Sequence, residues 1–198
     1  MTHRYVLHYA PDNASLIIRL ALEEMGLPYD TVLVDRMQDA QRSAAYRQLN
    51  PAGRIPTLET PHGPISETAA ILLWLVDRHG RLGPVPTDPA RAAFLNWLFF
   101  VSNTLHADLL NLFYVRRYGP EPKWPAMREA AKARITRALT VLQDDAAPRL
   151  PDWFCAAEPS VLDLYVAAAL RWLQLYPVEG AGWFDLPAFP NLHDMCAR

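Results

Sequence analysis

Cysteine is almost absent from this chain. Only Cys155 and Cys196 occur among its 198 residues. Two cysteines cannot build the disulfide framework of a small secreted domain, and they exclude a zinc site made mainly of cysteine. This usage is typical of a protein that folds in a reducing compartment, so we expect a cytoplasmic location.

Charge of one sign, long apolar runs and metal-binding spacings are also missing. The formal net charge is −2, so no positive excess indicates a nucleic-acid surface. No apolar run approaches the roughly 18 residues that a membrane-spanning helix needs. Residues 1–4 lead straight into a strand-like run, so we expect no signal peptide. We recognise no metal-ligand spacing, Ser–His–acid arrangement or glycine-rich phosphate loop. We therefore expect no nucleic acid, membrane or metal among its partners.

Residues 1–80 alternate between strand and helix patterns. Alternating and β-branched runs predict strands at 5–9, 29–34, 55–60 and 64–66, and helical spacing of apolar residues predicts helices from Ser15, at 39–49 and at 67–79. The order is β-α-β-α-β-β-α. Its first strand–helix–strand unit should cross over right-handed, which makes its two strands parallel.

The remainder of the chain has a different pattern. Residues 81–89 are dense in glycine and proline and predict a linker. Residues 90–198 then follow as a helical domain. Apolar stripes at helical spacing predict helices at 90–117, at 124–146 and after Ser160. The fold class is therefore an α/β domain followed by an all-α domain.

Two short segments carry most of the information about function. Pro56 stands at the start of an apolar strand, where proline cannot donate to a sheet ladder. A cis Ile55–Pro56 bond would turn the backbone of Ile55 outward, toward an extended peptide-like ligand. Ser66-Glu67-Thr68 opens the next helix, and a helix N-terminus favours a carboxylate. Together they predict a site for a small acidic peptide, with an edge-strand proline and ordinary helix capping as the alternatives.

These motifs, in this order, resemble the cytosolic glutathione transferase family, and the run from Tyr9 to Ser15 is similar to its bacterial beta-type branch in particular. The resemblance rests on Asn50-Pro51-x-Gly53-x-Ile55-Pro56-Thr57-Leu58, on Ser66-Glu67-Thr68 and on a capping box, Ser160-x-x-Asp163, in the second domain. That family joins a thioredoxin-like N-terminal domain to an all-α C-terminal domain. The resemblance implies a detoxification enzyme, a transferase that takes glutathione as co-substrate and adds its thiolate to small apolar electrophiles. It also implies a homodimer.

The resemblance assigns glutathione contacts position by position. The backbone of Ile55, before Pro56, would pair with the cysteinyl part of glutathione. Glu67 would face the ammonium of the γ-glutamyl group, and the amide and hydroxyl of Thr68 would face its carboxylate. Arg54 is the candidate for the glycyl carboxylate.

The residue that stabilises the glutathione thiolate stays open among Ser15, Asn13 and Tyr9, in that order of preference. The run from Tyr9 to Ser15 resembles the beta-type branch, except that Ala14 stands where that branch has cysteine. Alanine cannot form a mixed disulfide with glutathione, so we do not expect thiol–disulfide exchange. The structural alternatives are a helix N-cap for Ser15, a turn residue for Asn13 and a core residue for Tyr9.

For the second substrate, the resemblance points to the long helix that begins the second domain. His106 matches a histidine near the site of beta-type relatives, and Phe113 and Tyr114 are further candidates for this electrophile pocket. Core packing is the alternative for each. The segment 187–192 resembles the start of the family's last helices, but the sequence ends at Arg198, so we expect a short final pocket wall. Two rival functions remain, namely a non-catalytic protein-interaction module of the same fold and a glutathione-dependent peroxidase or isomerase.

Overall fold

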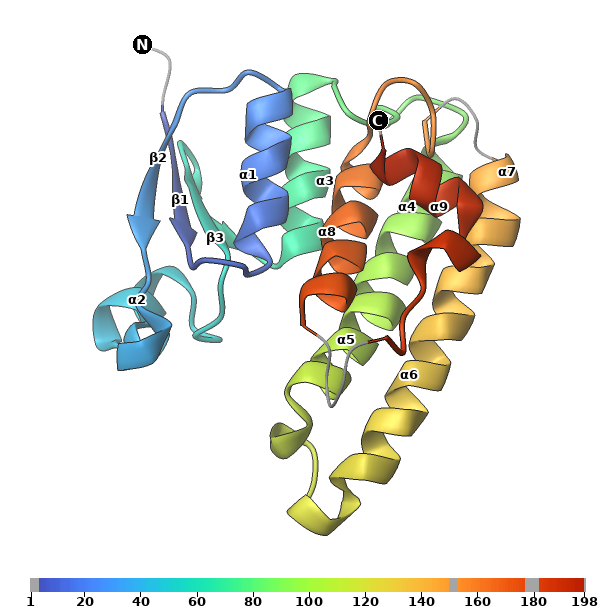
Figure 1. Ribbon diagram of the computed structural model, residues 1–198. Helices are drawn as coiled ribbons and strands as arrows, with labels where there is room; N and C mark the ends of the chain where they lie inside the picture. Colours follow the sequence, from blue (N-terminus) through green and yellow to red (C-terminus); the bar gives the residue numbers. More distant parts are fainter. Residues whose placement is uncertain (1–3, 150–152, 177–181, 198) are drawn as a thin grey trace. The chain divides into compact units, whose positions relative to one another are not determined.

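The computed structural model describes residues 4–149, 153–176 and 182–197 (Figure 1). Contacts divide the chain into two compact units, Met1–Pro86 and Thr87–Arg198. The division falls inside residues 81–89, and the role of that stretch as a linker stays a prediction. Within the described ranges, no helix has both the length and the apolar character that a bilayer crossing demands.

The first unit is built on a four-stranded mixed sheet in the order β2-β1-β3-β4. The strands are β1 (Tyr5–Tyr9), β2 (Tyr29–Leu33), β3 (Thr57–Thr60) and β4 (Gly63–Ser66). β1 is parallel to β2, which confirms the predicted crossover, and antiparallel to β3. β3 pairs antiparallel with β4. The predicted order of strands and helices is therefore confirmed, although β3 begins two residues later than expected.

Two helices cover one face of this sheet. α1 (Ser15–Glu24) and α3 (Thr68–His79) lie side by side on it in Figure 1. The core between the layers contains Leu7, Ile17, Ile18, Leu58 and Ile71, all with no exposed surface. Burial of these apolar side chains fixes the register of the strands that position the site.

The predicted helix at 39–49 is instead two shorter pieces. A 3-10 turn, Ala40–Arg42, precedes α2 (Ala44–Leu49). Ser43 separates them because its backbone is extended, with φ −61° and ψ 152°, and its hydroxyl accepts a hydrogen bond from the Tyr46 amide. A serine in this conformation is an N-cap, so it starts a new helix rather than continuing the previous one.

The second unit is helical in its described parts. Its α-helices are α4 (Arg91–Phe100), α5 (His106–Phe113), α6 (Trp124–Val141), α7 (Ala147–Arg149), α8 (Val161–Leu175) and α9 (Pro190–Cys196). The π-helical segments Val101–Leu105 and Leu142–Ala146 connect α4 to α5 and α6 to α7. The predicted helix at 90–117 therefore contains a π segment and ends at Phe113, because Tyr114 has left helical geometry, with φ −119° and ψ 36°.

The apolar stripes of the second unit form its core as predicted. One stripe runs through α4, the π segment and α5 and is fully buried at Phe94, Leu98, Val101, Leu105, Leu109 and Leu112. Ser160 and Asp163 form the predicted capping box at the start of α8. Between α5 and α6, Arg134 donates to Asp108 at 2.7 Å. These contacts hold α5, the helix that carries the candidates His106 and Phe113, and the start of α8.

Candidate functional site

The loop before β3 places a peptide backbone at the edge of the sheet. The Ile55–Pro56 peptide bond is cis, as predicted. Both ladders of β3 start at Thr57, so the backbone of Ile55 lies outside them. Within the described residues we find no hydrogen bond to the amide or carbonyl of Ile55. This backbone is therefore available to an extended ligand, which is the mode of binding in strand addition.

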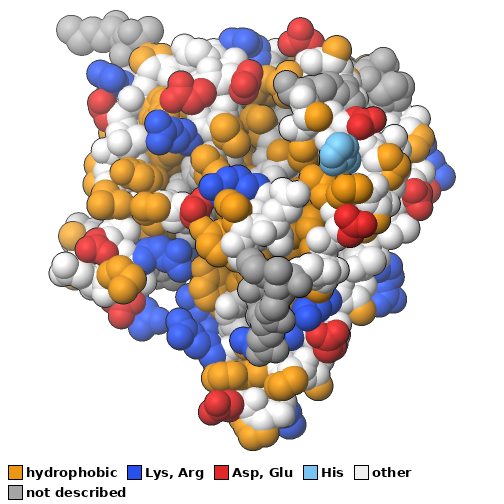
Figure 2. Space-filling view, viewed as in Figure 1, with side chains coloured by type: hydrophobic (Ala, Val, Ile, Leu, Met, Phe, Trp, Pro, Cys, Tyr) orange, Lys and Arg blue, Asp and Glu red, His pale blue; other side chains and the backbone are white. Residues whose placement is uncertain are grey.

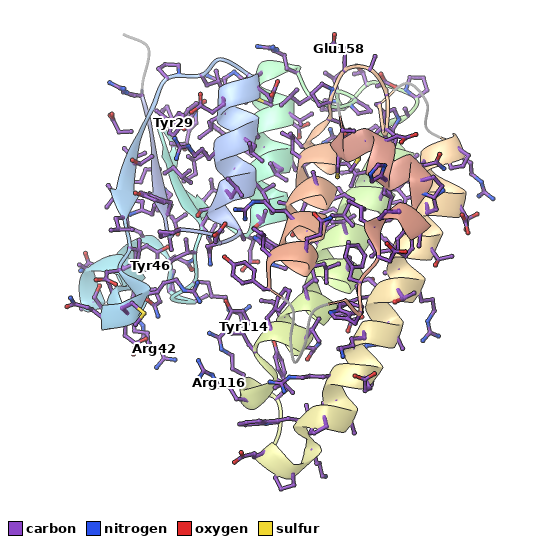
Figure 3. The ribbon with its side chains drawn as sticks, in the orientation of Figure 1. Tyr29, Arg42, Tyr46, Tyr114, Arg116 and Glu158 are labelled. Atoms are coloured by element: carbon purple, nitrogen blue, oxygen red, sulfur yellow. The ribbon has the colours of Figure 1, made fainter. Side chains whose placement is uncertain are left out.

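Two buried polar side chains hold this loop. The carbonyl of Arg54 accepts hydrogen bonds from the Tyr46 hydroxyl and from the Asn50 side-chain amide, both at 2.7 Å. The Tyr46 hydroxyl also lies 2.9 Å from the Thr57 hydroxyl, and burial raises the pKa of this tyrosine. Figure 3 shows Tyr46 at α2. Sequence reasoning missed Tyr46, whose partners lie 8 and 11 residues away, whereas Asn50 belonged to a recognised motif without an assigned role.

Gly53 makes the turn of the same loop. Its φ is +61°, and a Cβ added there would lie 2.9 Å from the backbone carbonyl oxygen of Gln41. Both the left-handed conformation and the close approach favour glycine at this position. The loop that presents Ile55 is thus fixed by a backbone constraint at Gly53 as well as by hydrogen bonds to Arg54.

Glu67 begins α3 with an unusual backbone. It has φ 69° and ψ 118°, and its side chain makes no capping hydrogen bond. Ordinary N-capping, one of the two alternatives from sequence, is therefore wrong for Glu67. Its carboxylate is exposed, while Thr68, the first residue of α3, is only 7% exposed. Strained backbone of this kind costs of order 1–3 kcal/mol and is concentrated at ligand-binding sites.

Ser15, the first candidate for thiol activation, is turned into the protein. It is 1% exposed, and its hydroxyl donates to the Ala10 carbonyl at 3.1 Å. The same oxygen accepts from the Ala10 amide at 3.3 Å. Ser15 is also not an N-cap, because α1 is capped at Ala14 without a side-chain bond. The single hydroxyl proton of Ser15 is therefore already used in the hydrogen bond to the Ala10 carbonyl.

Asn13 and Tyr9 keep donors that no contact uses within the described residues. Asn13 Oδ1 accepts from the Ser15 amide at 3.3 Å, so Nδ2, on the other side of the side chain, remains as a donor. Asn13 is half-buried in the turn before α1, in agreement with the alternative of a turn residue. Tyr9 ends β1 and is also half-buried, and we find no partner for its hydroxyl in that part of the structure. Of the three candidates, these two can donate to an anion without breaking an existing bond.

The three candidates for the electrophile pocket have separate surroundings. His106 lies at the start of α5, with its Nδ1 2.7 Å from the Tyr165 hydroxyl of α8. Burial lowers the pKa of the His106 imidazole to about 4. Phe113 makes an edge contact with Tyr176, with ring centroids 6.4 Å apart. The Tyr114 ring, labelled in Figure 3, lies 4.1 Å from the guanidinium of Arg117.

Positive side chains are concentrated on the segment that contains α2. Arg36, Arg42, Arg47 and Arg54 occur between residues 36 and 54, and Figure 2 shows blue side chains in this part of the first unit. The guanidinium of Arg54 is exposed and makes no hydrogen bond or ion pair that we find within the described residues. Among those residues, no group of three His, Cys, Asp or Glu side chains could hold a metal. The segment thus offers cations for an acidic ligand.

Comparison with known proteins identifies the family. The N-terminal domain of glutathione S-transferase matches residues 14–78, and its C-terminal domain matches residues 112–198. Glutathione S-transferase GstA of Escherichia coli O157:H7 is 27% identical over 188 residues, which cover 92% of this chain and 89% of the relative. The glutathione S-transferase-like protein gedE of Aspergillus terreus is 30% identical, with 91% and 83% covered.

A solved structure agrees with this match. The glutathione transferase from Burkholderia graminis, which has two glutathione molecules bound per subunit, superposes with a TM-score of 0.83. It is 26% identical, and the alignment covers 98% of this chain and 82% of that one. The thioredoxin-like and all-α fold class is thereby confirmed. From its sequence, its fold and these relatives, the chain belongs to the glutathione S-transferase family.

Proposed function

We propose that this chain binds glutathione in its first unit and adds the glutathione thiolate to small apolar electrophiles. Two features of the first unit carry the proposal: the backbone of Ile55 lies outside the sheet ladders, and Glu67 combines a strained backbone with an exposed side chain. The Ile55 backbone can form hydrogen bonds with an extended peptide, and the Glu67 carboxylate can accept from a ligand ammonium group. The glutathione bound to the Burkholderia relative supports the identity of the peptide.

Each part of glutathione has a proposed contact. The Ile55 backbone pairs with the cysteinyl residue, and the Glu67 carboxylate accepts from the γ-glutamyl ammonium. The first-turn amide and the hydroxyl of Thr68 donate to the γ-glutamyl carboxylate, because a helix N-terminus has amides without helical partners. The Arg54 guanidinium pairs with the glycyl carboxylate. The exposed position of Glu67 and Arg54 supports both charge pairs.

Activation of the thiol requires a hydrogen-bond donor beside the sulfur. A free thiol has a pKa of about 8.5, and lowering it by about two units needs roughly 2.7 kcal/mol of preference for the anion. A neutral donor that is fixed in place supplies part of this energy. The available Nδ2 of Asn13 supports this residue as the main donor, with the Tyr9 hydroxyl as the second. Ser15 serves a positioning role, since it ties the turn back to Ala10.

The wider biological role follows the family resemblance. We propose a cytoplasmic homodimer that acts in detoxification, and light scattering after size-exclusion chromatography tests the dimer directly. The named glutathione S-transferases among the relatives do not favour the interaction module. A panel of halogenated aromatics, epoxides and hydroperoxides distinguishes conjugation from peroxidase activity, and a maleyl substrate tests isomerisation.

Calorimetric titration with glutathione tests the binding site. Glu67→Gln removes the charge but retains the shape, and it should weaken glutathione binding by about 10- to 100-fold, because a hydrogen bond to a charged group contributes about 1.5–3 kcal/mol. Glu158→Gln, at an exposed glutamate of the second unit labelled in Figure 3, is the matched control and should bind as the wild type does. No heat of binding at millimolar glutathione in the wild-type protein would refute the proposal.

A further inference from the structure

A buried polar cluster lies between the sheet and α2 in the first unit. His8 of β1 and Thr57 of β3 are direct partners in the ladder, so their side chains lie on the same side of the sheet. The ring of Tyr46, which is labelled in Figure 3, makes an edge contact with the His8 ring, with centroids 5.8 Å apart. The Tyr46 hydroxyl lies 2.9 Å from the Thr57 hydroxyl. His8, Tyr46 and Thr57 are 7%, 6% and 0% exposed, so three segments of the chain meet in this cluster.

The hydrogen bonds between these hydroxyls run in one direction, toward the backbone of Arg54. The Tyr46 hydroxyl donates its only proton to the Arg54 carbonyl at 2.7 Å. Thr57 must therefore be the donor in the bond between the two hydroxyls, because a phenol has a single proton. Each bond in such a chain polarises the next one. The carbonyl of the residue immediately before Ile55 is thus held by a chain that begins in β3.

His8 is held in turn by Glu59. Its Nε2 lies 2.7 Å from Oε1 of Glu59, which follows Thr57 by two residues on the same strand. A carboxylate ion only accepts hydrogen bonds, so Nε2 carries a proton and donates it. The side chain of His8 is 9% exposed, whereas that of Glu59 is 42% exposed. A partly exposed carboxylate therefore fixes the orientation of a buried imidazole.

Packing alone does not account for this pair. A buried imidazole loses hydration, and an apolar side chain of similar size would cover the Tyr46 ring without that cost. A hydrogen bond has a direction, so the polar pair supplies a defined orientation that an apolar side chain does not. The ring that receives this orientation is that of Tyr46, whose hydroxyl holds the loop before β3.

We propose that His8 and Glu59 are positioning residues for the backbone of Ile55. Glu59 orients the imidazole of His8, this ring orients the phenol ring of Tyr46, and the phenol hydroxyl holds the loop at the Arg54 carbonyl. An exposed carboxylate of β3 is thereby linked to the loop that precedes the same strand. That glutathione is the ligand whose affinity responds rests on the proposed function, whereas the control of the loop does not.

The backbone amide signal of Ile55 in the ligand-free protein tests this path. Glu59→Leu removes the acceptor for the imidazole but retains a side chain of similar size, and it should shift the Ile55 signal in a ¹⁵N–¹H correlation spectrum. Glu59→Gln retains a side-chain oxygen that can accept from Nε2, so it should restore the signal to near its wild-type position. An unmoved signal in Glu59→Leu, or an equal shift in Glu59→Gln, would overturn the proposal.

Asp30→Ala is the control for the loss of a carboxylate from the same sheet. Asp30 lies on β2, and its carboxylate is 3.2 Å from the guanidinium of Arg4. This ion pair makes no contact with the cluster around Tyr46 that we find within the described residues, so Asp30→Ala should leave the Ile55 signal in place. The signal is measured on the folded protein, so a loss of stability alone does not move it.

A double-mutant cycle tests whether the path passes through Tyr46. Tyr46→Phe removes the hydroxyl that holds the Arg54 carbonyl but retains the ring, and it should itself shift the Ile55 signal. Addition of Glu59→Leu to Tyr46→Phe should then have little further effect, because the link through which Glu59 acts has been removed. Additive shifts would show that Glu59 reaches the loop by another route and would refute the role of Tyr46.

Calorimetric titration measures the consequence for glutathione. Tyr46→Phe and Glu59→Leu should each weaken binding by about 2- to 10-fold, the range that one neutral hydrogen bond supplies. Glu59→Gln should recover most of the affinity, and Asp30→Ala should bind as the wild type does. Wild-type affinity in Glu59→Leu would overturn the positioning role. Absence of glutathione binding in the wild type, with the expected Ile55 shifts retained, would count against the proposed function alone.

Discussion

The hydroxyl of Ser15 donates to the backbone carbonyl of Ala10, with 3.1 Å between the two oxygens. This bond separates two roles that a serine at a helix start can have. A hydroxyl that donates to a buried carbonyl stabilises a turn, whereas one that activates a thiol must donate to the sulfur. We therefore expect Ser15→Ala to lower the free energy of unfolding by about 1–3 kcal/mol, since it leaves polar backbone atoms of Ala10 unpaired. Urea unfolding measures this loss.

The ultraviolet absorbance of bound glutathione thiolate should instead depend on Asn13. Asn13→Asp retains the Oδ1 that accepts from the Ser15 amide but replaces the Nδ2 donor with negative charge. The pKa of the bound thiol should rise by about 1–2 units, because a donor is lost and a like charge is gained. Tyr9→Phe should produce a smaller rise, and Ser15→Ala should leave the pKa nearly unchanged. A larger rise in Ser15→Ala than in Asn13→Asp would reverse our assignment.

Two glycines with the same left-handed backbone conformation allow the cost of that conformation to be measured apart from the cost of a steric clash. Gly26 and Gly53 have φ of +64° and +61°, but only at Gly53 would an added Cβ meet a neighbouring atom, the Gln41 oxygen at 2.9 Å. Gly26→Ala should cost about 1–2 kcal/mol through its left-handed conformation alone. Gly53→Ala should cost about 2–4 kcal/mol, since it adds overpacking to the same strain.

Glutathione affinity should also differ between the Gly53→Ala and Gly26→Ala variants. The Gly53 loop presents the backbone of Ile55, so Gly53→Ala should weaken binding, whereas Gly26→Ala should not. Thermal unfolding and calorimetric titration of both variants provide the two measurements. Equal stability losses for the two variants would show that the approach to Gln41 is relieved by local movement.

The sequence predicted the core better than the contacts of the site. The stripe from Phe94 to Leu112 has helical spacing, and burial follows directly from such spacing. Periodicity does not show the π turn Val101–Leu105, because the buried stripe keeps spacings of three and four residues through it. The contact between His106 and Tyr165 spans 59 positions, so no local pattern could reveal it. Ser15 was misread as a possible cap for the same reason, since its partner Ala10 is set by the turn geometry rather than by residue type.

The partly buried His106 should make the protein less stable in mild acid. Its pKa is lowered from 6.5 to about 4 in the folded protein, so between these values the unfolded chain binds more protons than the folded one. Stability therefore decreases as pH falls through this window and is unaffected by this group above it. The full difference corresponds to about 3 kcal/mol. Burial raises the pKa of Asp163, which acts in the opposite direction.

The difference between wild type and His106→Gln isolates this contribution, because Asp163 is present in both proteins. The variant should be less sensitive to pH between about 6.5 and 4 in urea unfolding. His62→Gln, at an exposed histidine of the turn before β4, is the control and should follow the wild-type curve. Parallel curves for wild type and His106→Gln would mean that the imidazole can charge without leaving the fold.

The side chain of Arg81 caps the C-terminal end of α1, although Arg81 lies far from that helix in the sequence. Its Nη1 donates to the Met25 carbonyl at 2.6 Å, and its Nη2 donates to the Glu24 carbonyl at 3.1 Å. The last carbonyls of a helix have no helical partner, and they carry the negative end of the helix dipole. A guanidinium at this position donates hydrogen bonds to the carbonyls and places a positive charge beside the dipole. Arg81→Ala should therefore lower the free energy of unfolding by about 1–3 kcal/mol.

Arg81→Lys should recover only part of this loss, because a single ammonium group cannot reproduce the planar two-donor geometry. Arg137→Ala, at an exposed position of α6, is the control and should change stability by less than about 0.5 kcal/mol. The urea midpoint measures all three variants. Arg81 lies in the segment that composition predicted as a linker. A loss of about 1–3 kcal/mol in Arg81→Ala would mean that this residue belongs to the first unit and that the linker begins after residue 81. Equal midpoints for Arg81→Ala and Arg137→Ala would instead show that the end of α1 is satisfied by solvent.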